Sequence, residues 1–116
     1  MAIQKKPIKA IRDFLERRNK TAFSMPTEHG KTLAIEIQDW RPAGNFDKLF
    51  AGYWEEVNGD QVPSPNLEIL IVEGQASARI HTGSPFDRPH RDDGVANLIL
   101  KGIVEHLATE MDEVAE

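Results

Sequence analysis

The sequence predicts one α+β domain of two layers, in which an N-terminal helix, an antiparallel meander of about five short strands and a C-terminal helix follow one another. Three observations predict this fold class. Apolar residues recur at helical spacing near both ends of the chain and alternate with polar residues between them. Glycine-containing turn signals separate the alternating segments, and strands joined by short turns pair antiparallel. The 116 residues fit a single domain, 1–116, whose helices we expect on one face of the sheet.

Residues 7–18 are predicted to form the first helix. Pro7 suits its first turn, where a backbone N–H has no helical partner to lose. Asn19 is expected to end the helix, because asparagine tolerates the left-handed conformation that follows many helices. Residues 1–6 are expected to be frayed. The apolar residues at helical spacing are Ile8, Ile11, Phe14 and Leu15.

From Thr21 onward, apolar and polar residues alternate along the chain. Residues 22–25 and 32–40 are predicted to form a hairpin around the turn-like segment 27–31, because the second segment alternates large apolar residues with small or polar ones. The loop that follows is expected to span residues 41–47. The alternating sets of the second strand are Leu33, Ile35 and Ile37 against Ala34, Glu36 and Gln38.

A third strand is predicted at residues 48–57, rich in aromatic residues and ended by the strong turn signal Asn58-Gly59-Asp60. Pro63 and Pro65 are expected to keep the chain out of a regular ladder until about residue 66, because proline cannot donate a hydrogen bond to a neighbouring strand. The last two strands are predicted at residues 66–73 and 77–83.

Helical spacing returns from about Asp93 to Met111. Asp92 or Asp93 is expected to accept hydrogen bonds from the first free amides of this helix, and its charge suits a helix N-terminus. The acidic residues 112–116 are expected to be frayed. One broad apolar face is made of Ala96, Ile99, Leu100, Ile103, Val104, Leu107 and Met111.

The composition and the charge distribution exclude or disfavour several classes of function. The chain has no cysteine, so disulfides and thiolate metal sites are excluded. It has neither the apolar core of a secretory signal nor an apolar run of membrane-spanning length, so we expect a cytoplasmic protein with no membrane partner. Residues 1–20 carry a net charge of +5 and the other 96 residues carry −10. Lys5, Lys9 and Arg12 line one side of the first helix, but acidic residues interrupt them, so nucleic-acid binding is a minor alternative.

The segment HTGSPFDRPHRDDG, residues 81–94, concentrates histidine and aspartate. Such ligand types suit zinc, manganese or iron, so a metal-binding module or a metal-dependent hydrolase is the alternative function. The candidate ligands are His81, Asp87, His90 and Asp93. Their spacing matches no compact metal motif. The segment equally fits a strand exit, a proline-stiffened loop and a helix N-cap, so our leading interpretation has no metal and no cofactor.

Catalytic motifs are absent from the sequence: there is no phosphate loop, no GxGxxG and no GxSxG. Glu55 and Glu56 are adjacent on a strand, so they point to opposite faces and cannot act as a carboxylate pair. We therefore favour a binding protein over an enzyme. Leu98 and Gly102 lie one turn apart on the side of the last helix opposite its apolar face, and could form the contact of a homodimer.

The expected binding surface is the aromatic turn region of the third strand, where Tyr53 and Trp54 must lie on opposite faces. Polar groups mounted on a turn beside aromatic residues make specific contacts. The residues expected to bind a partner are Tyr53, Trp54, Asn58 and Asp60. The sequence therefore predicts a small accessory or regulatory protein that acts by binding another protein.

The stretch YWEEVNGDQVPSPNLEILI, residues 53–71, resembles a family of small proteins found in phages, plasmids and other mobile elements. The matching positions are Tyr53, Trp54, Glu55, Asn58, Gly59, Asp60, Pro65 and the run Leu67 to Ile71. The family has no established activity. The resemblance therefore implies an accessory protein of a mobile element, and it supplies no catalytic residue.

Overall fold

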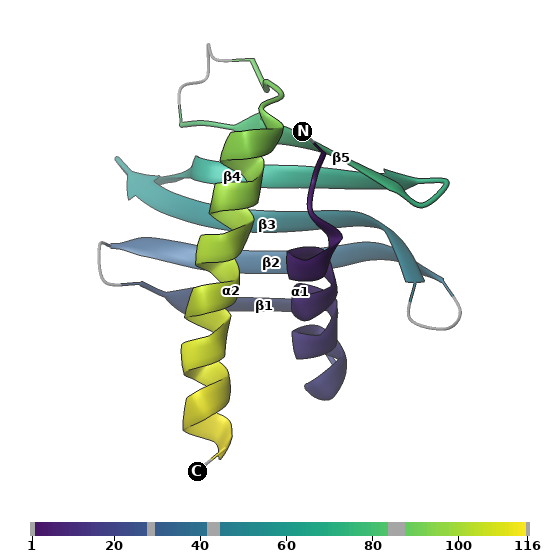
Figure 1. Cartoon of the computed structure of the whole chain (residues 1–116). Coiled ribbons are helices and arrows are strands. Elements are labelled where there is room, and N and C mark those ends of the chain that lie inside the picture. Colours follow the sequence, from purple (N-terminus) through teal and green to yellow (C-terminus); the bar gives the residue numbers. More distant parts are fainter. Residues whose placement is uncertain (1, 28–29, 42–44, 84–87, 116) are drawn as a thin grey trace.

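The structure, a computed structural model, describes residues 2–27, 30–41, 45–83 and 88–115, with the side chains of 45 and 110–115 left out. Two helices flank five strands in the chain (Figure 1). The elements are α1 (Lys5–Arg17), β1 (Ala22–Pro26), β2 (Lys31–Arg41), β3 (Asn45–Val57), β4 (Asp60–Val72), β5 (Gln75–His81) and α2 (Asp93–Ala115).

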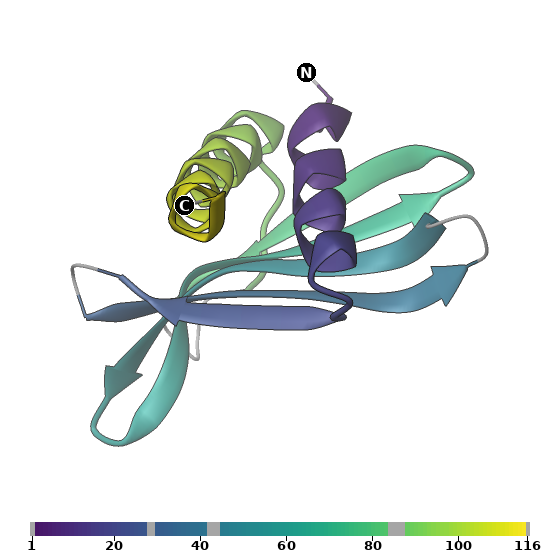
Figure 2. The ribbon, with the colours of Figure 1, turned by 90° about the horizontal axis from the view of Figure 1, so that it is seen from below.

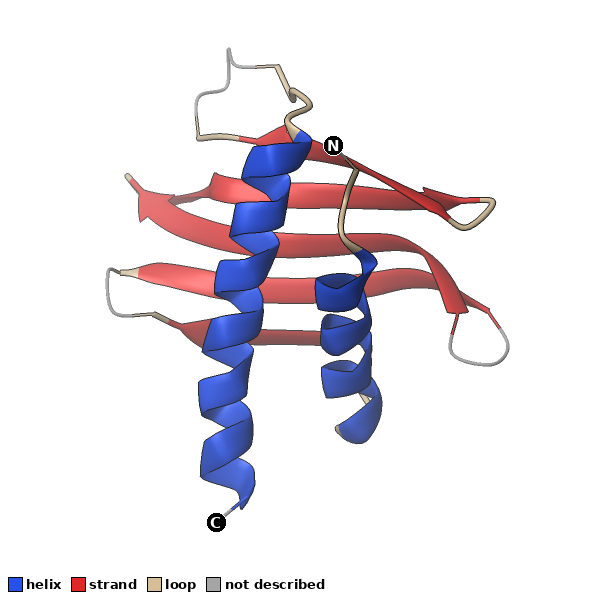
Figure 3. Cartoon of the chain, in the orientation of Figure 1, coloured by secondary structure: helices blue, strands red, loops and turns tan. Residues whose placement is uncertain are grey.

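The five strands form one antiparallel sheet in the order β1-β2-β3-β4-β5, so each strand pairs with its neighbours in sequence. Both helices lie across the same face of this sheet (Figures 1 and 3), and the view from below shows no helix on the other face (Figure 2). The predicted α+β meander with two layers is confirmed. Within the described part of the chain, neither helix offers the long apolar stretch that crossing a bilayer requires.

Helix α1 begins at Lys5, two residues before the predicted start, and ends at Arg17, one residue before the predicted end, with Asn19 following as the predicted terminator. Asn19 has a φ of 54°, in the left-handed region. Its N–H donates to the Glu16 carbonyl at 3.0 Å and the Lys20 N–H donates to the Leu15 carbonyl at 3.1 Å, which satisfies carbonyls that the end of the helix leaves free. The four predicted apolar residues of this helix are all buried.

The core lies between the helices and one face of the sheet. Alternation along the strands puts one set of side chains there, as predicted for β2. From α2, the side chains of Ala96, Leu100, Ile103 and Leu107 fill the same layer. The start of α2 is fixed by Asp92, whose carboxylate accepts a hydrogen bond from the Val95 N–H at 3.1 Å. The buried hydrophobic strand residues are Leu33, Ile35, Ile37, Phe46, Leu49, Ala51, Leu67, Ile69, Ala78 and Ile80.

The loop predicted at residues 41–47 is shorter in the structure, because β2 continues to Arg41 and β3 begins at Asn45. Phe46 lies opposite Trp40 in the register, and the two rings meet edge to face with centroids 5.9 Å apart. Phe46 is buried against the core. The burial of this aromatic pair extends the ladder past the residues whose composition indicated a loop.

The prediction that Pro63 and Pro65 keep the chain out of the sheet was wrong, because both lie within β4. β5 pairs with β4 only from Asn66 onward. Among the described strands, residues 60–65 therefore pair with β3 alone, so a missing N–H on the other side costs no hydrogen bond to β5.

A close backbone contact bends β3 and β4 together. The register between them shifts by one residue between Gly52 and Trp54. A Cβ atom at Gly52 would lie 2.5 Å from the Asn66 Cα and 2.5 Å from the Pro65 carbonyl oxygen, so only glycine permits this approach. Beyond this point the β3–β4 hairpin leaves the plane of the sheet on the side away from the helices (Figure 2).

We expect Gly52→Ala to lower the free energy of unfolding by about 1–3 kcal/mol, because the added methyl group overlaps backbone atoms that cannot move aside locally. Gly102→Ala is the matched control: its Cβ would lie at an ordinary 3.7 Å from the Tyr53 hydroxyl, and alanine favours a helix over glycine by about 1 kcal/mol. Urea unfolding followed by circular dichroism measures both. Equal stability of the two variants would contradict the close approach at Gly52.

Candidate functional site

The structure separates the four residues predicted to bind a partner. Tyr53 faces the helices, and its hydroxyl lies 2.8 Å from Nδ1 of His106 on α2. Trp54, the next residue along the strand, faces the side of the sheet without helices and is half-buried. Asn58 and Asp60 are exposed at the tip of the β3–β4 hairpin, as the turn signal predicted. Trp54 and the hairpin tip can thus share a surface that excludes Tyr53.

The predicted metal ligands have separate structural roles where they are described. His81, at the end of β5, has its Nε2 atom 3.4 Å from a carboxylate oxygen of Glu68. His90 pairs through its backbone with Ile80, at the edge of β5. Asp93 is the first residue of α2, and Asp87 lies outside the described residues. Among the described residues, no three His, Asp or Glu side chains gather as a metal ion would require.

The basic residues of α1 border a small groove. Lys5, Lys9 and Arg12 line it together with Phe46 and other apolar residues at the far end of the sheet, and its volume is about 200 Å³. The Arg12 guanidinium is already paired with its neighbour Asp13, at 3.0 Å. The groove therefore combines two lysines, Lys5 and Lys9, with apolar lining residues.

Of the two residues predicted to form a homodimer contact, only Leu98 is exposed. Leu98 is 70% exposed. Gly102 is half-buried and faces the hydroxyl of Tyr53, because α2 lies against β3 at this point. The interpretation that both residues lie opposite the core face was wrong for Gly102, which is part of the contact between α2 and the sheet.

A cleft opens on the side of the sheet without helices, and we call it the open-face cleft. Its volume is about 700 Å³, within the range of roughly 300–1,000 Å³ typical of ligand sites. Small side chains on β1 and β2 leave the space, and aromatic side chains on β3 border it. The residues that define it are Ser24, Ala34, Glu36, Phe50, Trp54 and Asn66.

The register of the strands explains how these residues meet. Ser24 lies opposite Ala34, which lies opposite Gly52, so a row of small residues crosses β1, β2 and β3. Phe50 and Trp54 flank Gly52 on the same face of β3, and their Cα atoms are separated by about 13 Å of strand. The bend at Gly52 brings β4 over this row, and with it Asn66.

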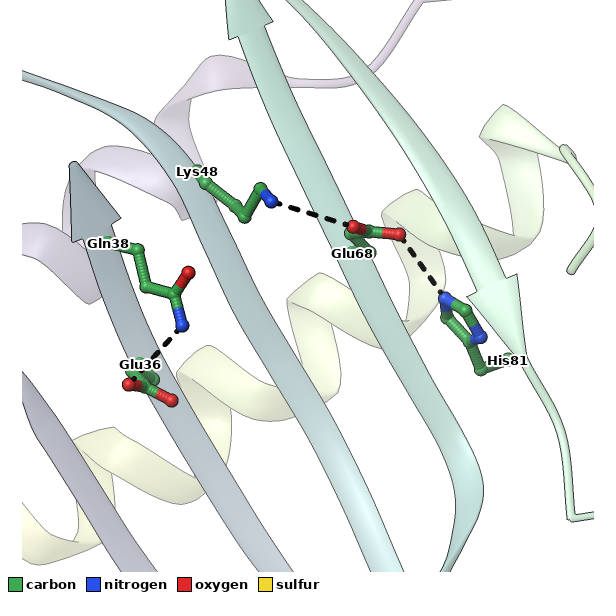
Figure 4. Close-up of polar contacts among 5 residues, drawn as sticks. All are labelled: Glu36, Gln38, Lys48, Glu68 and His81. Carbon is green, nitrogen blue, oxygen red and sulfur yellow. Dashed lines mark hydrogen bonds and ion pairs between the residues drawn. The ribbon is translucent and has the colours of Figure 1, made fainter.

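Phe50 has a glutamate directly opposite it on each neighbouring strand, Glu36 on β2 and Glu68 on β4. The two carboxylates differ in the polar groups that surround them. Glu68 on β4 is 4.0 Å from the Lys48 ammonium and 3.4 Å from the His81 ring (Figure 4). Glu36 on β2 accepts one hydrogen bond, at 3.5 Å, from the neutral amide of Gln38 (Figure 4). In the part of the chain that the structure describes, no cation lies within ion-pair distance of Glu36.

Asn66 is the most buried polar side chain of the cleft. Only 5% of the residue is exposed, and no hydrogen bond to its side-chain amide is found among the described residues. The Asn66 amide atoms are not among the fully buried polar atoms without a partner, which in the described residues are Arg18 Nη2 and Trp40 Nε1, so water reaches this amide in the cleft. The cleft therefore presents to solvent an amide without a hydrogen bond to the described residues and a carboxylate with only the weak one from Gln38.

Sequence reasoning found Trp54 but missed Glu36, Phe50 and Asn66. Alternation alone places Phe50 on the face of Trp54, because four residues separate them on one strand. It also places Glu36 opposite the buried face of β2. The meeting of these residues with Asn66 depends on the cross-strand register and on the bend at Gly52.

Comparison with protein-family models, curated proteins and solved structures finds no match to this chain. The resemblance to proteins of mobile elements stays a prediction.

Tyr53 is the only tyrosine of the chain, so tyrosinate absorbance near 295 nm reports on it alone. Burial raises the pKa of its hydroxyl, and the negative charge of Glu105 raises it further. We expect Tyr53 to ionise above the ordinary value of about 10. Because this pKa is raised in the folded state, the stability that the neutral phenol contributes is present below the unfolded pKa and is lost as the pH rises through the folded one.

Glu105→Gln should lower the Tyr53 pKa part of the way, because burial remains the larger cause. Glu16→Gln, on α1, is the control and should leave the titration unchanged. A wild-type midpoint at or below that of a free tyrosine amide would contradict the placement of Tyr53 against α2.

Proposed function

We propose that the protein is a small accessory protein that binds a segment of a partner protein in the open-face cleft. The observation that carries the proposal is a cleft of about 700 Å³ on an uncovered sheet face, bordered by the half-buried Phe50 and Trp54. Aromatic residues are enriched at the centres of protein interfaces, where they supply contact area at a low cost in conformational entropy. Asn58 and Asp60, on the same hairpin as Trp54, extend this surface.

The chemistry of the cleft favours binding over catalysis. Its one carboxylate, Glu36, has no second carboxylate or histidine as a cleft neighbour that could share acid–base work. Glu68, on the other side of Phe50, is engaged by Lys48 and His81. An open cleft also leaves water in contact with whatever is bound, which suits recognition more than a protected reaction.

The alternative, a metal-binding module or metal-dependent hydrolase, gains no support from the described residues. His81 is beside Glu68, and the backbone of His90 is engaged by β5. A cytoplasmic location and an accessory role in a mobile element belong to the proposal as expectations from the sequence.

A random peptide library selected on the immobilised protein tests the proposal. We expect the selected peptides to lose at least tenfold in affinity on Trp54→Ala, because truncating a central aromatic anchor typically costs about 2 kcal/mol or more. Leu98→Ala is the control, since it removes an exposed apolar side chain from a helix on the other face. Fluorescence anisotropy of the labelled peptides gives the dissociation constants.

Circular dichroism and urea unfolding would establish that Trp54→Ala keeps its fold. Selected peptides that bind both variants with wild-type affinity would rule out the open-face cleft as the binding surface.

A further inference from the structure

We infer that the open-face cleft selects an arginine side chain of the partner segment, with the guanidinium held by Glu36 beside the rings of Phe50 and Trp54. This inference rests on the proposed function and adds the chemistry of the bound residue. It begins with the charge of Glu36. A carboxylate on a sheet face with a cationic neighbour normally pairs with it, as Glu68 does with Lys48.

Lys48 lies diagonally between the two glutamates on the strand that separates them. Its ammonium approaches Glu68 and also lies 5.6 Å from the centroid of the Phe50 ring. Lys20 also lines the cleft, but no ion pair joins it to Glu36. The Glu36 carboxylate is therefore available to a cation from outside, and Gln38 holds it from the side by a weak hydrogen bond of 3.5 Å.

The aromatic residues specify the kind of cation. Phe50 lies directly opposite Glu36 across β2 and β3, and Trp54 borders the same cleft. A planar guanidinium stacks on aromatic rings and forms two parallel hydrogen bonds to a carboxylate, whereas an ammonium is a strongly hydrated point charge. Rings beside an unpaired carboxylate thus favour arginine over lysine.

Asn66 gives the main chain of the partner a place to bind. Its amide both donates and accepts hydrogen bonds, as one peptide group requires, and it makes no hydrogen bond to the described residues while keeping access to solvent from the cleft. The row of Asn66, Gly52, Ala34 and Ser24 and the row of Glu36 and Phe50 are neighbours on one sheet face, about 7 Å apart. A segment lying along the row of small residues can therefore extend one side chain to Glu36.

Three probes are titrated into the ¹⁵N-labelled protein: Nα-acetyl-arginine amide, its neutral isostere Nα-acetyl-citrulline amide, and Nα-acetyl-lysine amide. The readouts are the indole N–H of Trp54 and the side-chain amide of Asn66 in nitrogen–proton correlation spectra. The chain has two tryptophans, so Trp40→Phe assigns the Trp54 signal. We expect acetyl-arginine amide to shift both signals with millimolar affinity and acetyl-citrulline amide to bind at least tenfold more weakly.

Glu36→Gln should bring the affinity for acetyl-arginine amide down to that for the citrulline probe. Glu16→Gln, which removes an exposed carboxylate from α1, should leave it unchanged. Glu36 is itself exposed, so its substitution leaves the core intact. Equal binding of the arginine and citrulline probes, or of the arginine and lysine probes, would overturn the inference.

Failure of this inference differs from failure of the proposed function. If library peptides bind in a Trp54-dependent way but without any effect of Glu36→Gln, the cleft binds a partner segment and the arginine assignment is wrong. If no peptide depends on Trp54, the binding function of the cleft is itself wrong, and the arginine assignment falls with it.

Discussion

Burial on one face of the sheet is the constraint on which the rest of this structure depends. The buried aliphatic side chains of the strands project to one side, and the chain has two helices with which to cover them. Both helices pack there, because an apolar face of a sheet must be covered by another layer. In the described part of the chain no helix covers the opposite face, so a partner that contacts the sheet directly would approach from that side (Figure 2).

The bend at Gly52 turns that uncovered face from a plane into a cleft. Because β4 crosses so close to Gly52, the β3–β4 hairpin leaves the sheet away from the helices. The same contact places Asn66 beside the row of small residues on β1 and β2. The stability of the sheet and the recognition that we propose therefore share one feature, because a substitution that disturbed the contact at Gly52 would also displace Asn66.

The two glutamates beside Phe50 show how strand order distributes charge on this face. Glu68 lies between β3 and β5, which supply Lys48 and His81. Glu36 lies between β3 and the edge strand β1, where its directly opposite neighbour is Ala22. The residue type is the same, but β1 places only the methyl group of Ala22 opposite Glu36, so this exposed carboxylate has no ion pair among the described residues. The arginine specificity that we propose for the cleft thus rests on a difference between the neighbours of the two glutamates.

The sequence by itself determined the local features of this protein. Periodicity and capping within a few residues determine the order and type of the elements, the stop of α1 before Asn19, an aspartate cap at residue 92 or 93 for α2, and the opposite faces of Tyr53 and Trp54. Only the tertiary structure decided the rest. The prolines of β4 could enter the sheet because the pairing with β5 ends at Asn66, and a prediction made along the chain could not locate that end. The assembly of Glu36, Phe50 and Asn66 into one cleft likewise depends on register across three strands and on a backbone contact, both of which join residues far apart in the chain.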